Sequence, residues 1–296
     1  MPLPQPQHSL ASAFGRAGVP LFRQVALWGM IFSSASVAAQ DVSEAVFAEI
    51  DSSHNWNEVF FDEGTGTREN GGWRDGIWQR KWFLDGEIAA VENTPDGMHL
   101  QAGPRYRENA HHMVLWTHDT FEGDLKIEYE FTRTDRQDRC VVLLYIQATG
   151  SGMGPYAEDI TAWNELRSVP TMGHYFRHMN AYAISYAVHN PFAGNGYTDY
   201  IRARRYQPEL ASLRGTELGA YTETGLWKPF VSYQVTVVKE DRRLAMRVEG
   251  DGQVAYFHFE NPDYPVITHG RVGLRHMFTR SALYRNFRIS ETGQGN

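Results

Sequence analysis

Histidine, tyrosine and arginine are concentrated in one stretch of this sequence, and these side chains can move protons and hold anions. The densest group is His174-Tyr-Phe-Arg-His178, which Tyr186 and His189 follow closely. An arginine can form two parallel hydrogen bonds with a carboxylate. A histidine or tyrosine beside it can accept or donate a proton. The spacing therefore predicts chemistry on a carboxylate-bearing substrate.

β-Elimination from a uronate is the reaction that best suits this set of side chains. The proton on C5 lies next to the carboxylate and is weakly acidic, so its removal requires stabilisation of the enolate-like charge that develops. In this hypothesis Arg177 holds the carboxylate, and one of His174, His178 and His189 accepts or shares the proton. Tyr186 then serves the leaving oxygen. Each of these residues could also be structural.

A wider set of residues is expected to bind the substrate. They lie at strand ends, in a basic and aromatic stretch, or facing away from apolar neighbours. They are His112, Tyr145, Gln147, Tyr197, Arg202, Arg204, Arg275 and His276. In the stretch from Tyr197 to Tyr206, aromatic faces could pack on sugar rings while arginines pair with carboxylate or sulfate. A solvated loop with cation–π pairs would explain the same stretch.

Metal ligands are not arranged in any recognisable motif. His178, His189 and Asp199 could bind a metal ion, but no His-x-His or His-Glu-x-x-His pattern occurs. We therefore predict that the chemistry requires no cofactor. A structural Ca²⁺ bound by backbone carbonyls and carboxylates would leave no motif in the sequence, and that alternative stays open.

β-Strands are the elements that must position these residues. The chain has 296 residues, 42% of them hydrophobic and 13% aromatic, which is a composition typical of β proteins. From Trp56 onward, short β-type runs alternate with turn clusters, as in a sandwich. Residues 125–132 alternate strictly, with Ile127, Tyr129 and Phe131 on one face. We therefore expect an all-β fold with two antiparallel sheets.

The same alternation predicts which side chains lie between the two sheets. The predicted core residues are Ile127, Tyr129, Phe131, Val142, Leu144, Ile146, Val235, Val237, Val272 and Leu274. In the run 141–147, Leu143, Tyr145 and Gln147 should then face the other way. The run 182–189 is ambiguous: either Tyr182, Ile184 and Tyr186 face the groove, or Ser185, Ala187 and His189 do.

Three segments, residues 41–55, 148–180 and 190–230, depart from the strand pattern. The first is expected to form a short helix or an arm, and residues 159–167 within the second have weak helical character. Residues 148–180 and 190–230 are predicted to be long loops rich in Gly, Tyr, Arg and Pro. Long loops on a rigid sandwich often carry function.

The first 39 residues have the order of a secretory signal peptide. A polar, basic segment precedes the apolar run 25–32, and small residues follow up to Ala39. The apolar run is too short to span a bilayer. We predict cleavage near Ala39–Gln40, one mature domain over residues 40–296, and a periplasmic or secreted protein that does not contact the membrane. An uncleaved anchor and an over-long predicted start are the alternatives.

The remaining composition limits the partners. The formal net charge is −7, and no basic segment is long enough to follow a phosphate backbone, so nucleic acid is not expected as a partner. Cys140 is the single cysteine and cannot form an intrachain disulfide.

Several segments together resemble a known family. They are Trp116-Thr, Phe121-Glu-Gly-Asp-Leu, Asn180-Ala-Tyr-Ala-Ile-Ser-Tyr186, Gly270-Arg-Val-Gly-Leu-Arg-His276 and Tyr284-Arg-Asn-Phe-Arg-Ile289. In these segments, over about residues 56–290, the chain resembles the YesU-like proteins, domain-of-unknown-function family 1961. That family belongs to the concanavalin A-like lectin/glucanase superfamily. The resemblance implies a β-jelly-roll sandwich with a carbohydrate groove, and a role in breaking down uronate-containing polysaccharides such as pectin.

The resemblance transfers no catalytic residues, so three functions remain open. The first is a lyase or dehydratase acting on an anionic polysaccharide or oligosaccharide. The second is a carbohydrate-binding protein without catalysis. The third is a glycoside hydrolase using dispersed acids such as Glu128, Glu130 and Asp199. The paired-acid sequence Glu-x-Asp-x-x-Glu of jelly-roll glucanases is absent, which argues against the third.

Overall fold

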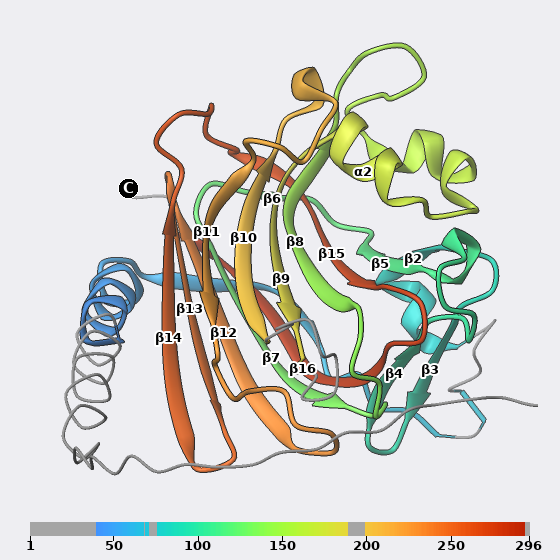
Figure 1. Cartoon of the computed structure of the whole chain (residues 1–296), viewed down its shortest axis with the longest axis horizontal. Coiled ribbons are helices and arrows are strands. Elements are labelled where there is room, and N and C mark those ends of the chain that lie inside the picture. Colours follow the sequence, from blue (N-terminus) through green and yellow to red (C-terminus); the bar gives the residue numbers. More distant parts are fainter. Residues whose placement is uncertain (1–39, 68, 71–75, 189–198, 294–296) are drawn as a thin grey trace, which may run out of the picture. The chain divides into compact units, whose positions relative to one another are not determined.

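Two antiparallel sheets of eight strands each form the body of the protein (Figure 1). This computed structural model describes residues 40–67, 69–70, 76–188 and 199–293. Residues 40–296 form a compact unit of their own. The predicted signal peptide, residues 1–39, lies outside the described residues. In the described part, no helix has the length and apolarity that crossing a membrane requires.

The first sheet has the strand order β14-β13-β12-β7-β16-β4-β3, and β1 pairs with β16. Its strands are β1 (Trp56–Asp62), β3 (Ala90–Thr94), β4 (Gly97–Gln101), β7 (Leu125–Arg133), β12 (Ser232–Glu240), β13 (Arg243–Gly250), β14 (Gln253–Glu260) and β16 (Ser281–Thr292). β12 and β13 are consecutive along the chain and pair with each other as an antiparallel hairpin.

The second sheet has the order β11-β10-β9-β8-β15-β5-β2, and β6 pairs with β15. Its strands are β2 (Trp82–Asp85), β5 (Met113–Thr117), β6 (Phe121–Glu122), β8 (Val141–Gly150), β9 (Met179–Ala187), β10 (Tyr200–Tyr206), β11 (Glu217–Thr222) and β15 (His269–His276). The short helices are η1 (Ile77–Arg80), η2 (Asn109–His111), η3 (Ile160–Arg167), α2 (Met172–His178) and η4 (Pro208–Leu210).

The main core lies between the two sheets, as the alternation predicted. All ten residues expected there belong to this core, and Ile127, Leu144 and Val237 are fully buried. On β7 the burial alternates without a break, because a strand points successive side chains to opposite faces. The fold prediction, an all-β sandwich of jelly-roll type, is confirmed.

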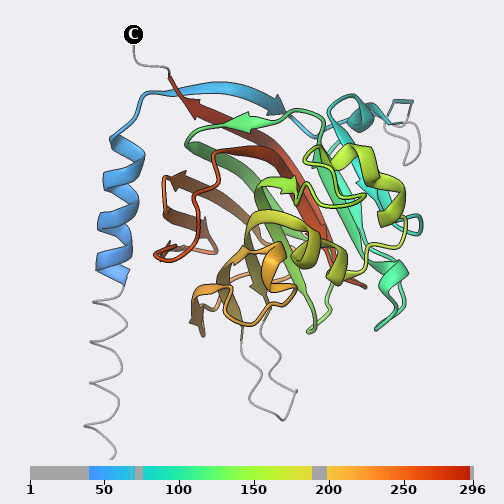
Figure 2. The same cartoon turned by 90° about the horizontal axis from the view of Figure 1, so that it is seen from above.

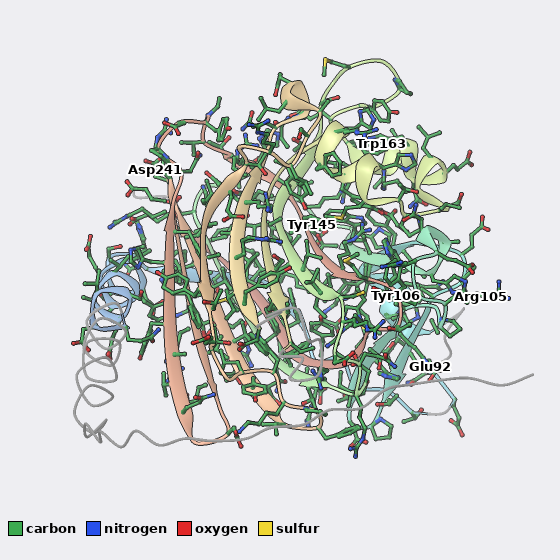
Figure 3. The ribbon with its side chains drawn as sticks, in the orientation of Figure 1. Glu92, Arg105, Tyr106, Tyr145, Trp163 and Asp241 are labelled. Carbon is green, nitrogen blue, oxygen red and sulfur yellow. The ribbon has the colours of Figure 1, made fainter. Side chains whose placement is uncertain are left out.

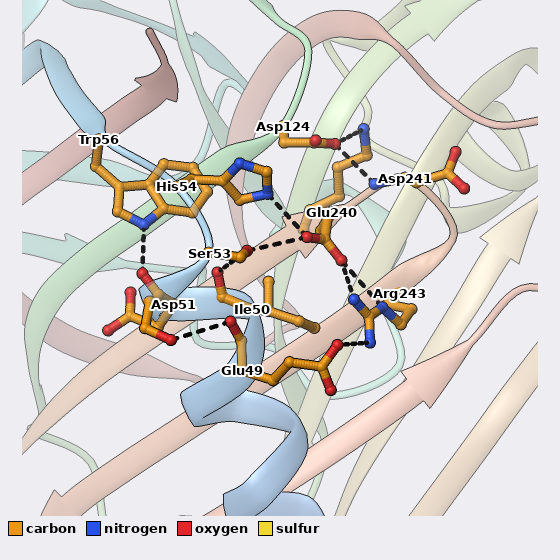
Figure 4. Close-up of polar contacts among 12 residues, drawn as sticks. Glu49, Ile50, Asp51, Ser53, His54, Trp56, Asp124, Glu240, Asp241 and Arg243 are labelled. Carbon is orange, nitrogen blue, oxygen red and sulfur yellow. Dashed lines mark hydrogen bonds and ion pairs between the residues drawn. The ribbon is translucent and has the colours of Figure 1, made fainter.

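A helix over residues 40–52 covers part of the outer face of the first sheet (Figure 2). Phe47 and Ile50 pack on Val238 and Ala245, which point away from the main core. Beyond the helix, the Glu240 carboxylate accepts a hydrogen bond from Ser53 and pairs with His54 and Arg243 (Figure 4). Arg243 also pairs with Glu49 on the helix, at 3.0 Å. The expectation of a short helix in this segment is confirmed.

The segments predicted as long loops contain regular structure. Residues 148–180 include the end of β8, η3, α2 and the start of β9. Residues 199–230 include β10 and β11, which extend the second sheet at its edge. The prediction of one long loop there is wrong. Arginines occupy every outward position between Tyr200 and Tyr206, which made β10 resemble a polar loop.

Candidate functional site

The outer face of the second sheet carries a pocket of about 640 Å³, with small side chains in its floor. Ser185 and Ala183 on β9 lie in register with Arg202 and Arg204 on β10. On the other side, Ser185 lies in register with Leu143 on β8. Serine and alanine are short, so the sheet surface is hollow at β9 while longer side chains rise from the strands on either side.

The wall on β10 is basic. The Arg202 guanidinium lies 4.5 Å from the Tyr200 ring centre and donates a hydrogen bond to its hydroxyl, at 3.1 Å. Arg204 pairs with Glu217 at 3.0 Å and donates to the Leu213 carbonyl at 2.8 Å. The same Glu217 lies 3.7 Å from Arg202. One carboxylate is therefore shared by two guanidinium groups, which leaves positive charge on this wall.

The pocket mouth combines an aromatic ring with two more arginines. Tyr106 is 42% exposed and stands at the surface (Figure 3). The guanidinium groups of Arg107 and Arg139 lie 5.2 Å and 5.3 Å from its ring centre. Phe278 supports the ring edge-on at 5.2 Å. In all, four arginines and one aspartate line the pocket, although the whole chain has a net charge of −7.

Asp85 fixes the helical segments that stand beside the pocket. Its carboxylate accepts hydrogen bonds from Trp116 Nε1 at 2.8 Å, Asn164 Nδ2 at 2.6 Å, Arg167 Nε at 2.6 Å and the Tyr175 hydroxyl at 2.9 Å. These donors come from β5, η3 and α2. Because one buried carboxylate binds all three elements, η3 and α2 are held against the second sheet (Figure 1).

Arg275 and His112 lie beneath α2. The Arg275 Nη2 atom donates to His112 Nδ1 and to the Pro170 carbonyl, both at 2.8 Å. Burial and the nearby Arg275 charge lower the pKa of His112 to about 3. The imidazole is therefore neutral at physiological pH, and its Nδ1 acts as the acceptor.

A stack of aromatic rings connects this buried region to the pocket. Tyr145 lies between Trp116 and Tyr175, with ring centres 5.2 Å and 5.9 Å away and nearly parallel planes. Tyr206, which lines the pocket, packs edge-on against Tyr145 at 5.8 Å. Burial raises the pKa of the Tyr145 hydroxyl, so it is protonated at neutral pH.

Five of the residues predicted to bind substrate lie on this face. Arg202 and Arg204 line the pocket directly. Tyr145, Arg275 and His112 form the buried cluster beside it. Their roles toward a ligand remain predictions.

The histidines and arginine of α2 do not line the pocket. Arg177 is exposed, with its guanidinium 5.4 Å from the Phe176 ring centre. His178 stacks on Tyr156 with ring centres 3.6 Å apart. Burial lowers the pKa values of His174 and His178. The helix supplies Met172 to the pocket wall instead.

Tyr186 and His276 lie between the sheets, so their predicted place in the groove is wrong. Tyr186 is 2% exposed, and its hydroxyl is 2.9 Å from the Tyr129 hydroxyl in the opposite sheet. Burial raises the pKa of the Tyr186 hydroxyl well above its ordinary value, which makes it a poor acid for a leaving group. His276 Nε2 is 2.9 Å from the Tyr284 hydroxyl. Tyr186 lies on the same strand face as Ile184, and His276 lies on the same strand face as Leu274. Both faces form the core between the sheets.

Gln147 is also structural. It has φ 51° at a bulge in β8, where the register with β9 shifts after Ile146. Its amide nitrogen donates to the Gly123 carbonyl at 2.9 Å, and the side chain is fully buried. The bulge ends the alternation of side chains that holds up to Ile146, so Gln147 does not point in the same direction as Tyr145. The prediction of a groove position for Gln147 is therefore wrong.

The dispersed acids do not converge on the pocket. Glu128 and Glu130 project from the outer face of the first sheet, because Ile127 and Tyr129 on the same strand point into the core. Asp199 accepts hydrogen bonds from Thr224 and from the Gly225 backbone. Their placement gives no support to hydrolysis by these acids.

His189 and Tyr197 lie outside the described residues. Within the described ranges, no group of three or more His, Cys, Asp or Glu side chains could hold a metal ion. A structural Ca²⁺ bound by backbone carbonyls is a separate question and stays open.

Several pocket residues were not predicted from the sequence. They are Ala183, Tyr106, Phe278 and Arg139, while Ser185 was one of two alternatives and Tyr206 belonged to the basic and aromatic stretch without being chosen as a site residue. For Tyr206 a signal was present, since Tyr200, Arg202, Arg204 and Tyr206 alternate with Ile201 and Ala203 along one strand face. The loop residues Tyr106 and Phe278 carry no such signal, because they meet only in the folded chain.

Comparisons with known proteins agree with this fold. Residues 78–289 match the family model described as Domain of unknown function (DUF1961). Among curated protein sequences, none matches this chain significantly. A Bacillus subtilis protein of unknown function with a galectin-like fold is similar, with a TM-score of 0.56 and 17% identity over 81% of this chain and 100% of that one.

Two sugar-bound structures are more distant. The lectin UEA-II complexed with galactose has a TM-score of 0.49 and 9% identity, over 78% of this chain and 97% of that one. The exoplasmic/lumenal domain of VIP36, in a Ca²⁺/Man3GlcNAc-bound form, has a TM-score of 0.46 and 12% identity, over 78% of this chain and 91% of that one.

Proposed function

This chain belongs to the DUF1961 family, and from that premise we propose that it binds carbohydrate in the pocket on the second sheet. The ligand class is an anionic polysaccharide or oligosaccharide. The observation that carries the proposal is the composition of the pocket, in which aromatic rings and four arginines surround a floor of small residues.

Each part of the pocket suits a different part of an acidic sugar. The apolar face of a pyranose ring packs on an aromatic side chain, and Tyr106 offers one at the mouth. Arg202 and Arg139 can pair with a carboxylate or sulfate. Ser185 in the floor can exchange hydrogen bonds with a sugar hydroxyl. A volume of about 640 Å³ is within the ordinary range of small-ligand sites.

Binding to a panel of neutral and anionic polysaccharides tests the proposal. We expect retention on uronate-containing polymers and weak retention on neutral glucans. Ser185→Leu fills the pocket floor and should abolish binding. Ser232→Leu, an exposed serine on β12 of the other sheet, is the matched control and should bind as the wild type does. Equal retention of all polymers, or unchanged binding by Ser185→Leu, would contradict the proposal.

β-Elimination at the same site is a second candidate function. The observation that favours it is the buried Arg275 guanidinium beside the pocket, a group that would stabilise the negative charge developing on a uronate. His112 is not the base in this candidate, because its Nδ1 lone pair already accepts from Arg275 and its pKa is lowered to about 3. The sequence-based choice of Tyr186 as the acid is not part of this candidate. Release of ultraviolet-absorbing unsaturated uronate from a bound polymer would support elimination. Tight binding without any such product would leave the carbohydrate-binding function alone.

A further inference from the structure

Arg275 is a fully buried cation that no carboxylate of the described residues pairs with. Its Nη2 atom is hydrogen-bonded to His112 and to the Pro170 carbonyl, and both partners are neutral. Its Nε and Nη1 atoms have no hydrogen-bond partner. The Tyr175 ring, 4.4 Å away, supplies a cation–π contact. A buried charge without a counter-ion is costly to the folded state, so this arrangement requires an explanation.

Arg167 provides an internal comparison. It is equally buried and is the last residue of η3, but its Nε atom pairs with Asp85 at 2.6 Å. Its Nη1 and Nη2 atoms donate to backbone carbonyls. The charge of Asp85 is thus matched by Arg167, and Arg275 is left as the unmatched charge of the buried cluster.

Two tyrosine hydroxyls lie beside Arg275. Tyr145 and Tyr206 are fully buried, the Tyr145 hydroxyl interacts with the Tyr206 hydroxyl and with Arg275, and neither hydroxyl is hydrogen-bonded to a group outside this cluster. The Arg275 charge is close enough to Tyr145 to counteract the effect of burial on its pKa. Guanidinium N–H groups and phenol hydroxyls are donors that a carboxylate accepts readily. Four donor atoms with this preference therefore face one another.

The cluster lies directly behind the pocket wall. Arg275 is in register with Leu143, which lines the pocket. Two methionines, Met172 and Met277, line the pocket and pack against the aromatic stack that contains Tyr145. Both are partly exposed. Methionine is unbranched and flexible, so these side chains can move aside at low energetic cost.

We propose that the pocket continues behind Met172 and Met277 into a subsite where Arg275, with the hydroxyls of Tyr145 and Tyr206, binds a single carboxylate. The inference rests on the proposed function and specifies it: the sugar unit in this subsite is a uronate. The carboxylate supplies the counter-ion that Arg275 lacks. Arg202 and Arg204 remain a separate, solvent-facing group that attracts anionic polymer.

Salt distinguishes the buried subsite from the basic wall. Charges at the surface are screened by added salt, whereas a desolvated pair is screened much less. We expect the wild type to bind glucuronate or galacturonate about tenfold more tightly than glucose even in about 0.5 M NaCl. Calorimetric titration with glucuronate, galacturonate, glucose and acetate measures this preference. Acetate shows whether the carboxylate binds without its sugar ring.

Arg275→Met is the decisive variant. Methionine fills similar space without charge, so the variant should remain folded, keep its affinity for glucose and lose the preference for uronates at high salt. Arg271→Met is the matched control, because Arg271 lies on the same strand face but pairs with Asp159 at 3.0 Å. It should keep the preference. A folded Arg275→Met protein that still prefers uronates tenfold would overturn the subsite.

Tyr145→Phe keeps the proposal testable if Arg275→Met does not fold. It removes one hydroxyl beside Arg275 and should weaken uronate binding severalfold with no effect on glucose. Tyr186→Phe, in the core between the sheets, should change neither. Unchanged uronate binding by Tyr145→Phe would count against the subsite. If the wild type bound no sugar of any charge, the proposed function itself would fail; if it bound all four probes without preference for uronates, only the subsite would fail.

Discussion

Two tyrosines in neighbouring strands show how position decides the use of identical side chains. Tyr186 points between the sheets and its hydroxyl is held by Tyr129. Tyr145 points to the outer face, in a stack with Trp116 and Tyr175, and its hydroxyl interacts with Tyr206 and Arg275. A hydroxyl engaged between the sheets is unavailable to a ligand, while one that lies beside a buried cation near the pocket favours an anion. The candidate site therefore includes Tyr145 and excludes Tyr186.

Cys140 gives a direct probe of the pocket, because it lines the pocket and is the single cysteine of the chain. Burial raises the pKa of its thiol to about 11. The thiolate is the reactive form, so alkylation by iodoacetamide should accelerate about tenfold per pH unit between about pH 7 and 10. A bound oligouronate should slow the reaction at fixed pH. Mass spectrometry of the intact chain measures both effects.

The chain unfolded in denaturant is the control, because the Cys140 thiol then has the ordinary pKa of a cysteine. There the rate should level off about two pH units earlier than in the folded protein, and ligand should have no effect. If the alkylation rate of the folded protein levelled off near pH 9, the raised pKa of the Cys140 thiol would be contradicted. Alkylation unaffected by a ligand that demonstrably binds would place the binding site elsewhere.

His276 makes the stability of the protein sensitive to acid. Burial and the nearby Arg280 charge lower its pKa to about 3 in the folded state. Between about pH 6.5 and 3 the unfolded chain therefore binds more protons than the folded one, and the free energy of unfolding decreases as the pH falls. His276→Phe removes this contribution. From pH 6 to pH 4 the wild type should lose about 2.5 kcal/mol more than the variant.

Denaturant titrations at several pH values measure this difference. At pH 8 both folded and unfolded wild-type chains carry a neutral His276, so the comparison there isolates the packing change of the substitution. His112, with a pKa also lowered to about 3, contributes equally to both proteins and cancels. Parallel stability curves for wild type and His276→Phe between pH 6 and 4 would show that His276 is not the titrating group.

At the scale of elements, close packing between β15 and β5 positions the aromatic stack. Gly273 lies in register with Trp116, and a Cβ atom at Gly273 would lie 2.4 Å from the Trp116 ring. The glycine therefore lets the indole lie flat on the strand, where Tyr145 can stack on it. The absence of a side chain at Gly273 thus leaves room for the Trp116 ring on which the stack is built.

Gly273→Ala should destabilise the protein by about 1–3 kcal/mol, because the added methyl group must displace the indole. The displaced ring should also change the near-ultraviolet circular dichroism of the aromatic stack. Gly173→Ala in α2 is the matched control: the nearest atom to its added Cβ is 3.8 Å away. Alanine is the better helix former, so this control should keep or gain stability, by up to about 1 kcal/mol. Equal stability of the two variants would contradict the packing argument.

The apolar core strands were easier to predict from the sequence than the strands that line the pocket. The alternation in β7 and the apolar run in β8 identified their core faces correctly. β10 was expected to be a loop because its outward residues are arginine and tyrosine. The alternation of Arg202 and Arg204 with Ile201 and Ala203 was present, but the buried Arg205 directly after Arg204 interrupts it, and this adjacent pair of arginines obscured the strand pattern.

At the scale of the whole molecule, the helix over residues 40–52 completes the described unit. The Gln40 side chain accepts a hydrogen bond from the Tyr256 backbone at 2.9 Å, and Ser43 bonds His258 on the same strand. The first described residue is thus already tied to β14. Removal of residues 1–39 would leave every one of these contacts intact.

We predict that the exported, mature protein begins near Gln40. Cleavage after Ala39 follows the small residues that signal peptidases require, and it spares the helix that packs on Val238. N-terminal sequencing of secreted or periplasmic material identifies the first residue of the mature protein. A variant with Arg at positions 37 and 39 in place of Val37 and Ala39 should be retained as precursor. A soluble cytoplasmic protein that keeps residues 1–30 would show that this segment is no export signal.

The sequence alone determined the sandwich and most of the facing of its core residues, because alternation along a strand is a local property of the backbone. It could not determine which face of residues 182–189 points inward, since both faces carry small, apolar or aromatic side chains. The opposite sheet decided this by placing Tyr129 against Tyr186. Likewise, residues that are distant in the sequence surround Ala183 and Ser185 and make them the floor of a pocket. Distant residues also surround Arg275 and leave it without a carboxylate partner. Tertiary packing, and not spacing, brings those neighbours together.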